Sequence, residues 1–371
     1  MSLNVLSYNC HGLENKVLQN DFFQFIKTSD IFVLLETHIT EDKVARFKKC
    51  FNGYDTYWKA AVRNSRFGRA IAGCVYGVKN ELKKYNISYE FNVKEDIELI
   101  IIKTCMKTIN IMPLYLRAAT WYDSFELVKH FLTNEDVENL VLIGDLNIRI
   151  GNEQQYLDEF IKSTFKAGFE IRKSKDPIVE AKGKAFLELC QDFGLHIMNG
   201  CTRGDENGNF TFMSGVGESV NDICALAHDN LKLVESFMVE NKIWSDHMPI
   251  TLTLNVKVRT VDNSMNLLPK LRWDDKKTDK YKENLNQELS DIKQFKNILD
   301  LKDLIQIVNS ANPNKNNQLG RNQFNKENKW FNYRCHNLRE KFLKALHQYR
   351  QNPTRVNKTK YLDTNRKYKE I

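Results

Sequence analysis

Short, continuous apolar runs are the feature that most restricts the fold of this chain. The runs Ile31–Leu35 (IFVLL) and Leu140–Ile143 (LVLI) have the length of a strand and carry no polar residue on either face. Such runs are typical of strands that are buried on both sides of a sheet. Helical periodicity appears before, between and after these runs, at Asn20–Lys27, Ser124–Leu132 and Gly183–Phe193. Strands interspersed with helices predict an α/β or α+β fold and argue against a helical bundle.

Further strands are predicted from shorter runs and from alternation between apolar and polar residues. They are Leu3–Tyr8, Gly73–Val78, Leu99–Thr104, Ile109–Leu116, Leu195–Asn199, Phe210–Met213, Asp222–Leu226 and Thr251–Val256. With 371 residues, 42% of them hydrophobic, the chain is long enough for two units. All of these strands precede residue 257, so we predict a folded domain over residues 1–256.

The remainder of the chain differs in charge. Residues 257–371 contain 26 lysines and arginines and 13 acidic residues, a net charge of +13, whereas residues 1–256 carry a net −5. This asymmetry predicts a polyanion as the partner of the basic part, and a solvated lysine-rich helical face is the equal alternative. We predict a basic extension of helices and linkers over 257–371, with helices at Asp274–Leu289, Lys296–Val308 and Lys329–Tyr349 and an asparagine-rich linker at Asn312–Asn328.

The sequence also bears on the compartment. No run approaches the roughly 18 apolar residues of a membrane helix, and the first residues lack the basic head and apolar block of a secretory signal. The eight cysteines contain no CxxC pair, which favours reduced thiols over a disulfide scaffold or a zinc ribbon. We therefore expect a nuclear or cytoplasmic protein that is not secreted and has no membrane partner. The oligomeric state is left open by the sequence.

Polar side chains gather at the ends of the predicted strands, where α/β proteins place their sites. Each one alone has a structural explanation, such as a helix N-cap for an aspartate after a strand. Several converging carboxylates would repel one another unless a cation bound between them. Mg²⁺ (or Mn²⁺) is the expected ion because it prefers oxygen ligands. The residues are Asn9, Glu36, Asp145, Asn147, Asp222, Asp246 and His247.

The order of these residues carries a family resemblance. The motifs LSYNCHGL, LLETHI, PLYLR, LIGDLN, FTF, SVND and SDHMPI, from Leu3 to about Val256, resemble the endonuclease/exonuclease/phosphatase superfamily. Within it, the chain looks most like the apurinic-type endonuclease domain of non-LTR retrotransposon polyproteins. The stretch RKSKDPIVEAKGKAFLELCQDFGLHIMNGCTRGDENGNFTF resembles the insert of those domains, and KWFNYRCHNLREKF resembles their linker to a reverse transcriptase. The resemblance implies a four-layer sandwich of two packed β-sheets flanked by helices.

The resemblance also implies roles for individual residues. Metal ligands would be Glu36, Asn9 and Asp246. Asp145 would orient or deprotonate the attacking water, and Asn147 and Tyr115 would contact the phosphate. His247, held by Asp222, would donate a hydrogen bond to a phosphate oxygen. The product would be a nick with a 3′-hydroxyl. Apart from the resemblance, Arg66 and Arg69 in the glycine-bearing stretch RNSRFGRAIAG predict phosphate contacts to DNA, and a merely solubilising role is the alternative. Arg117 is a further candidate for a phosphate contact. The chain departs from the family at His11, where Asp or Asn is common, and at Arg117, where proline or Asn often follows the tyrosine.

The leading hypothesis is therefore a Mg²⁺-dependent endonuclease that nicks DNA for target-primed retrotransposition, in a chain expected to stop before the reverse transcriptase. A phosphatase or phosphodiesterase of the same fold, acting on lipid or RNA, is the first alternative. A domesticated nucleic-acid-binding protein without catalysis is the second.

Overall fold

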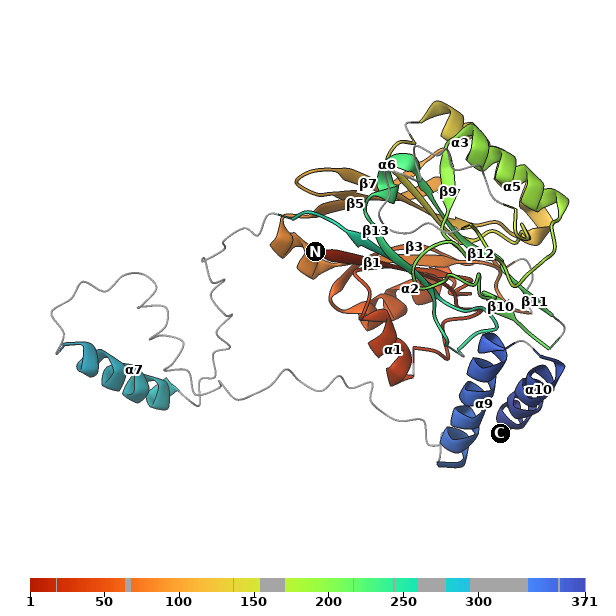
Figure 1. The fold of residues 1–371 in the computed structure, drawn as a ribbon. Coiled ribbons are helices and arrows are strands. Elements are labelled where there is room, and N and C mark those ends of the chain that lie inside the picture. Colours follow the sequence, from red (N-terminus) through yellow and green to blue (C-terminus); the bar gives the residue numbers. More distant parts are fainter. Residues whose placement is uncertain are drawn as a thin grey trace. The chain divides into compact units, whose positions relative to one another are not determined.

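Two six-stranded β-sheets form the centre of the structure (Figure 1), a computed structural model that describes residues 1–17, 19–63, 68–135, 137–153, 171–215, 217–242, 244–258, 278–293, 333–352 and 354–370. The first sheet has the order β13 (Val234–Val239), β14 (Ile250–Asn255), β1 (Ser2–Asn9), β2 (Ile31–Leu35), β4 (Cys74–Lys79) and β3 (Tyr54–Lys59). The second has the order β5 (Ser88–Lys94), β6 (Ile97–Lys103), β7 (Thr108–Tyr115), β8 (Leu140–Asp145), β12 (Asp222–Ala227) and β9 (Leu195–Ile197).

Helices cover the outer faces of both sheets. Phe22 of α1 (Asn20–Ile26) and Phe47 of α2 (Glu41–Lys48) pack with buried side chains of β1 and β2. On the second sheet, α3 (Trp121–Asn134) and α5 (Ala181–Asp192) share a buried cluster with β7 and β8. A third cluster joins the inner faces of the two sheets. The predicted four-layer sandwich is confirmed.

One feature of the strand pairing determines where polar groups meet. Among the strands that the structure describes, each sheet contains a single parallel pair, β1 with β2 in the first and β7 with β8 in the second. The other neighbours are antiparallel. Parallel strands end at the same edge of a sheet, so the residues that follow them lie side by side. The residues at these four ends are Asn9, Glu36, Tyr115 and Asp145.

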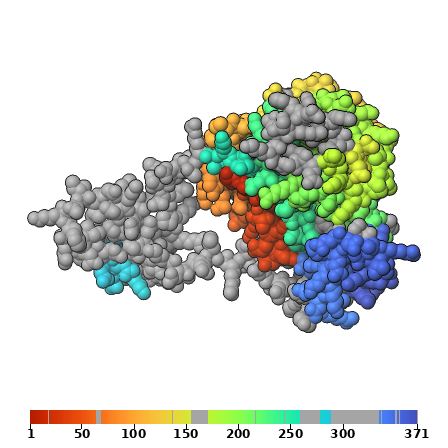
Figure 2. Space-filling model, in the orientation of Figure 1, coloured from red at the N-terminus to blue at the C-terminus, as the bar shows by residue number. Residues whose placement is uncertain are grey.

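The C-terminal helices α9 (Tyr333–Gln351) and α10 (Arg355–Lys369) pack against the domain. Phe342, Leu346 and Tyr361 are buried in the same cluster as α3 and α5. Figure 2 shows their surface, in blue, continuous with that of the domain. Met1–Arg259 and Lys326–Ile371 accordingly form one compact unit, and Thr260–Asn325 form a second, which contains α7 (Thr278–Lys293). The predicted domain boundary at residue 256 stays a prediction.

Most predicted elements agree with the structure within a few residues, including β2 and β8 from the continuous apolar runs. The prediction missed the strands β3, β5 and β13 and the helices α2, α6 (His228–Leu231) and α10. It also missed the short hairpin strand β11 (Glu218–Ser219), the partner of β10 (Phe212–Met213). Strands β3 and β5 lie at sheet edges and are half exposed, which weakens their apolar pattern. The predictions at Lys296–Val308 and Asn312–Asn328 lie outside the described residues. None of the described helices is long and apolar enough to cross a membrane.

Candidate active site

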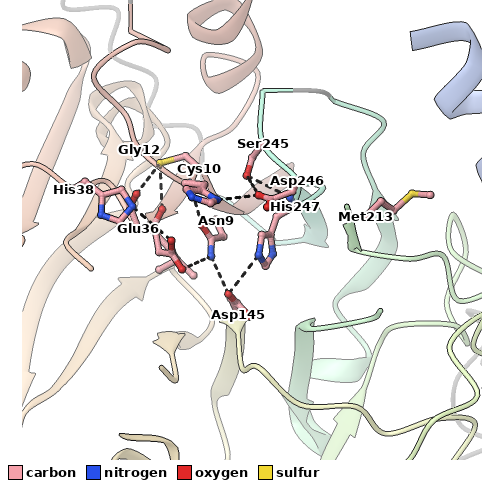
Figure 3. A network of polar contacts seen from close by, with 12 residues as sticks. Asn9, Cys10, Gly12, Glu36, His38, Asp145, Met213, Ser245, Asp246 and His247 are labelled. Atoms are coloured by element: carbon pink, nitrogen blue, oxygen red, sulfur yellow. Dashed lines mark hydrogen bonds and ion pairs between the residues drawn. The ribbon is translucent and has the colours of Figure 1, made fainter. Parts of the chain in front are cut away.

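Asn9 connects the two sheets at their common edge. Its Nδ2 donates to Glu36 Oε1 at 3.1 Å and to Asp145 Oδ2 at 2.9 Å, so one amide bridges a carboxylate from each sheet (Figure 3). Its Oδ1 accepts a hydrogen bond from the backbone N–H of His11 at 3.0 Å. Asn9 is 1% exposed, and every polar atom of its side chain is satisfied. The amide therefore sets the separation of the two carboxylates.

A second cluster lies on the Asp145 side of the site. His247 Nδ1 is 2.8 Å from Asp222 Oδ2, and its Nε2 is 3.9 Å from Asp145 Oδ2. Asp222 and Asp145 face each other in the register of β12 and β8, which explains why both carboxylates reach one imidazole. All three side chains are buried, and their ligand atoms lie within 4.8 Å of one another. The hydrogen bond to Asp222 holds the ring with Nε2 directed towards Asp145.

The electrostatics of this cluster follow from burial and from the number of carboxylates. Burial alone would lower the pKa of His247, but the surrounding aspartates outweigh burial, Asp222 most of all, and raise the pKa to about 10. Burial and the Asp222 carboxylate raise the pKa of Asp145 to about 7. At neutral pH, His247 is therefore a cation, and Asp145 can exchange a proton.

Glu36 is held by neighbours from three segments. Tyr115 donates its hydroxyl to Glu36 Oε1 at 2.6 Å, and His38 Nε2 lies 3.6 Å from Oε2. Burial would raise the pKa of Glu36, but the contacts with His38, Tyr115 and Asn9 outweigh it and lower the pKa to about 2. Burial and Glu36 together raise the pKa of Tyr115, so its hydroxyl stays a donor. Glu36 is thus a permanent anion at the edge of the sheet.

Asp246 is partly exposed and paired with an unexpected residue. Its Oδ1 lies 3.1 Å from Nδ1 of His11 and accepts a hydrogen bond from Ser245 at 3.0 Å. Burial would raise the pKa of Asp246, but the contact with His11 and the charge of His247 outweigh it and lower the pKa well below its usual range. Among the described residues, none donates a hydrogen bond to Oδ2 of Asp246.

The donor set fits a hard divalent cation. Glu36 and Asp246 are both anionic, and each uses one carboxylate oxygen for its hydrogen bonds. The second oxygen of each accepts no hydrogen bond from the residues that the structure describes, and Oε2 of Glu36 has only the 3.6 Å contact with His38. Two anionic oxygens at a polar edge suit Mg²⁺ or Mn²⁺. The buried cluster around His247 is less suited, because Nδ1 is already committed to Asp222.

Backbone strain also concentrates at this edge. Positive φ angles occur at His11 (43°), Glu36 (50°), His38 (56°) and Asn147 (51°). Residues other than glycine rarely adopt this conformation, which is enriched at functional sites. The turns after β1, β2 and β8 thereby direct these side chains back across the end of the sandwich.

The remaining predicted residues lie at the rim or beyond it. Asn147 donates its Nδ2 to the carbonyl of Leu116 at 3.0 Å, and its backbone N–H bonds Asp145. Arg69 donates to the carbonyl of His11 at 2.6 Å, which places it next to the site. Arg117 lies close enough to Tyr115 to act on its hydroxyl electrostatically. Arg66 lies outside the described residues.

Two residues that support the site were not predicted. Thr211 is fully buried, and its Oγ1 accepts hydrogen bonds from the backbone N–H groups of Asn221 and Asp222, both at 2.9 Å. His38, beside Glu36, is the second. Both stand inside motifs that carried the family resemblance, FTF and LLETHI, but nothing in a single sequence distinguishes them from packing residues.

Comparison with known proteins is informative at the level of the fold. No family model and no curated protein matches the chain. Among solved structures, the AP endonuclease LMAP from Leishmania major has a TM-score of 0.51 at 14% identity, over 69% of this chain and 88% of its own. The endonuclease domain of TRAS1, a telomere-specific non-LTR retrotransposon, has a TM-score of 0.47 at 18% identity, over 69% and 99%. An AP endonuclease from Archaeoglobus fulgidus has a TM-score of 0.48 at 14% identity, over 68% and 100%.

The two packed sheets and the first of these likenesses define the class of the fold. The chain shares with that AP endonuclease the fold of two packed β-sheets flanked by helices.

Proposed function

We propose that the chain is a metal-dependent endonuclease that hydrolyses phosphodiester bonds of DNA and leaves a 3′-hydroxyl end. The observation that carries the proposal is the bridge through Asn9, which joins an anionic Glu36 to a cluster of Asp145, Asp222 and a cationic His247. Phosphodiester hydrolysis needs a base for water, a cation for the phosphate and a group that stabilises the leaving oxygen. The site contains candidates for each of these roles.

Asp145 is the proposed base. A pKa near 7 lets a carboxylate accept a proton from water at neutral pH and release it again afterwards. The Asn9 amide and the backbone N–H of Asn147 each donate to one oxygen of this carboxylate, which fixes its orientation.

His247 is the proposed phosphate contact. Its cationic ring would donate to a non-bridging phosphate oxygen from Nε2, the nitrogen that does not bond Asp222. A charge-assisted hydrogen bond strengthens as negative charge develops on the phosphate in the transition state. Tyr115, a neutral hydroxyl beside Glu36, is the proposed second contact to the same group.

Glu36 and Asp246 would hold the divalent cation, with Asn9 next to Glu36. When bound, Mg²⁺ or Mn²⁺ polarises a phosphate oxygen and offsets charge on the leaving oxygen. The sequence resemblance to retrotransposon endonucleases supports target-primed insertion of a mobile element as the biological role.

Plasmid nicking tests the proposal. The protein should convert supercoiled plasmid to the open circle with Mg²⁺ and not with EDTA. Glu36→Gln and His247→Gln should each lower the rate by at least about 100-fold, since each removes a charge at the reacting phosphate. The nicked product should be extended directly by a DNA polymerase, which requires a 3′-hydroxyl.

Two exposed residues supply matched controls. Glu235→Gln and His130→Gln make the same chemical changes on the surface and should nick as the wild type does. Equal nicking by all variants would identify a contaminating nuclease and refute the proposal. Release of phosphate from a phosphoinositide without nicking would favour a lipid phosphatase, and DNA binding without hydrolysis would favour a non-catalytic protein.

A further inference from the structure

A cavity of about 290 Å³ lies beside the candidate active site, on the side of Asp246. One wall contains Ser245 and Asp246, which belong to the network at the edge of the sheets (Figure 3), and His11, which contacts Asp246. Another part of the lining, the helical wall, comes from α9 and α10, the two C-terminal helices. We call this cavity the C-terminal pocket. Its size is just below the range of about 300–1,000 Å³ that is usual for sites that bind small ligands.

The lining of the C-terminal pocket combines aromatic rings with cations. Trp244 stands on the domain side, and Tyr361 and Tyr368 on the side of α10. Two lysines also line the pocket, Lys16 from the domain and Lys369 from α10. Lys16 is 8% exposed, and its Nζ donates to the carbonyl of Gly12 at 2.8 Å, so this ammonium is held in place rather than extended into solvent.

The helical wall is anchored to the domain by specific contacts. The hydroxyl of Tyr361 donates to the carbonyl of Met213 in β10 at 3.3 Å, and that of Tyr349 donates to Glu218 Oε1 at 2.9 Å. The backbone N–H of Met213 in turn donates to the carbonyl of Asp246 at 2.8 Å. The hairpin β10–β11 therefore connects α10 directly to a residue of the candidate site.

The chemistry of the lining identifies the kind of ligand. A simple packing gap between a helix pair and a domain would be lined by apolar groups, whereas this cavity also contains two lysines and Asn365. Residues 333–370 carry 11 lysines and arginines and only 3 acidic residues, so the helical wall attracts polyanions. Aromatic faces beside cations are the means by which proteins hold unpaired nucleotides.

We propose that the C-terminal pocket binds one unpaired nucleotide of the DNA strand that passes through the active site, with its base against Tyr368 and its phosphate near Lys369. The proposal rests on the proposed function, because DNA is the substrate that would bring a nucleotide next to Asp246. The C-terminal helices would thereby add a contact to DNA that the two-sheet domain alone does not provide.

DNA binding without catalysis tests the pocket. Two labelled hairpins of equal length are compared by fluorescence anisotropy in EDTA, one fully paired and one with a single unpaired thymidine. The wild type should prefer the second by about 10-fold, in keeping with the contribution of one stacked base. Tyr368→Leu, which keeps apolar volume but removes the flat ring, and Lys369→Gln should each reduce this preference to less than about 3-fold.

Lys367→Gln is the matched control, since Lys367 is an exposed lysine of α10 that does not line the pocket. It should leave the preference unchanged, and thermal melting should show that all three variants are folded. The inference is overturned if the wild type has no preference for the unpaired nucleotide, or if the pocket variants weaken both hairpins equally. The anisotropy assay contains no metal, so it does not depend on catalysis. If the wild type failed to nick plasmid but still preferred the unpaired nucleotide, the proposed function would be refuted and the inference about the pocket would stand.

Discussion

Substitution of Asp222 by Asn isolates the electrostatic link between Asp222 and His247. The change removes a charge 2.8 Å from Nδ1 while keeping the size of the side chain and an oxygen that accepts a hydrogen bond. Separating the partners of a buried ion pair costs about 3–5 kcal/mol. At 1.36 kcal/mol per unit, this corresponds to a fall of about 2–4 units in the pKa of His247. The pKa should therefore decrease from about 10 to between about 6 and 8.

The raised pKa of His247 determines how the stability contributed by the ion pair changes with pH. In the wild type the ion pair stabilises the fold fully below about pH 6.5, and the stabilisation is lost as the pH rises through about 10. In Asp222→Asn the ring loses its proton at a lower pH. At pH 8 the cationic fraction should fall to between about one half and one hundredth, whereas at pH 6 at least about half of the rings remain charged.

Two measurements check this prediction. A histidine NMR titration of the metal-free protein, with His247→Gln to assign the signal, reports the pKa directly. Plasmid nicking between pH 6 and pH 9 should show a variant that approaches the wild type at pH 6 and loses activity as the pH rises. Asp192→Asn, on the exposed end of α5, is the control. An unchanged His247 pKa in the variant, or an equal loss of nicking at every pH, would show that the assigned coupling is wrong.

Three further substitutions test the fold around the site. Gly144→Ala should lower the free energy of unfolding, measured in urea, by about 3 kcal/mol or more, because a Cβ there would lie 1.9 Å from a backbone oxygen of β7. Gly217→Ala is the control and should leave the free energy of unfolding unchanged, because the space around Gly217 is open. Burial and a neighbouring histidine lower the pKa of His196 to about 4, so acid favours the unfolded chain, in which this histidine takes up a proton more readily. His196→Gln should therefore lose less melting temperature than the wild type between about pH 7 and pH 4.5. The control His130→Gln should behave as the wild type. Phe342→Ala should cost about 3–5 kcal/mol if α9 belongs to the folded core, and an unchanged urea midpoint would contradict that packing.

The sequence was informative wherever burial imposes a pattern. Continuous apolar runs predicted β2 and β8, because a strand covered on both faces has no position for a polar residue. Glu36 and Asp145 follow those runs, and both are predicted as site residues because a carboxylate next to a buried strand is costly without a partner. Edge strands such as β3 were missed because one side of the strand is exposed and the pattern is weak.

The family resemblance supplied what the patterns could not. The choice of two packed sheets over other α/β arrangements depended on the ordered motifs, because alternating strands and helices are compatible with several topologies. The pairing of His11 with Asp246 was not predictable, since the two residues are 235 positions apart and neither forms a pattern with the other.

The sequence alone determined which segments form buried strands and which polar residues follow them, because both depend on neighbouring residues along the chain. The family resemblance had already paired Asp222 with His247. The tertiary structure alone decided that Asn9 bridges Glu36 and Asp145, that Asp145 also lies beside His247, and that two C-terminal helices complete a pocket beside them. These contacts depend on strand order and on packing across the sandwich, and they raise or lower pKa values only once the groups share a buried environment.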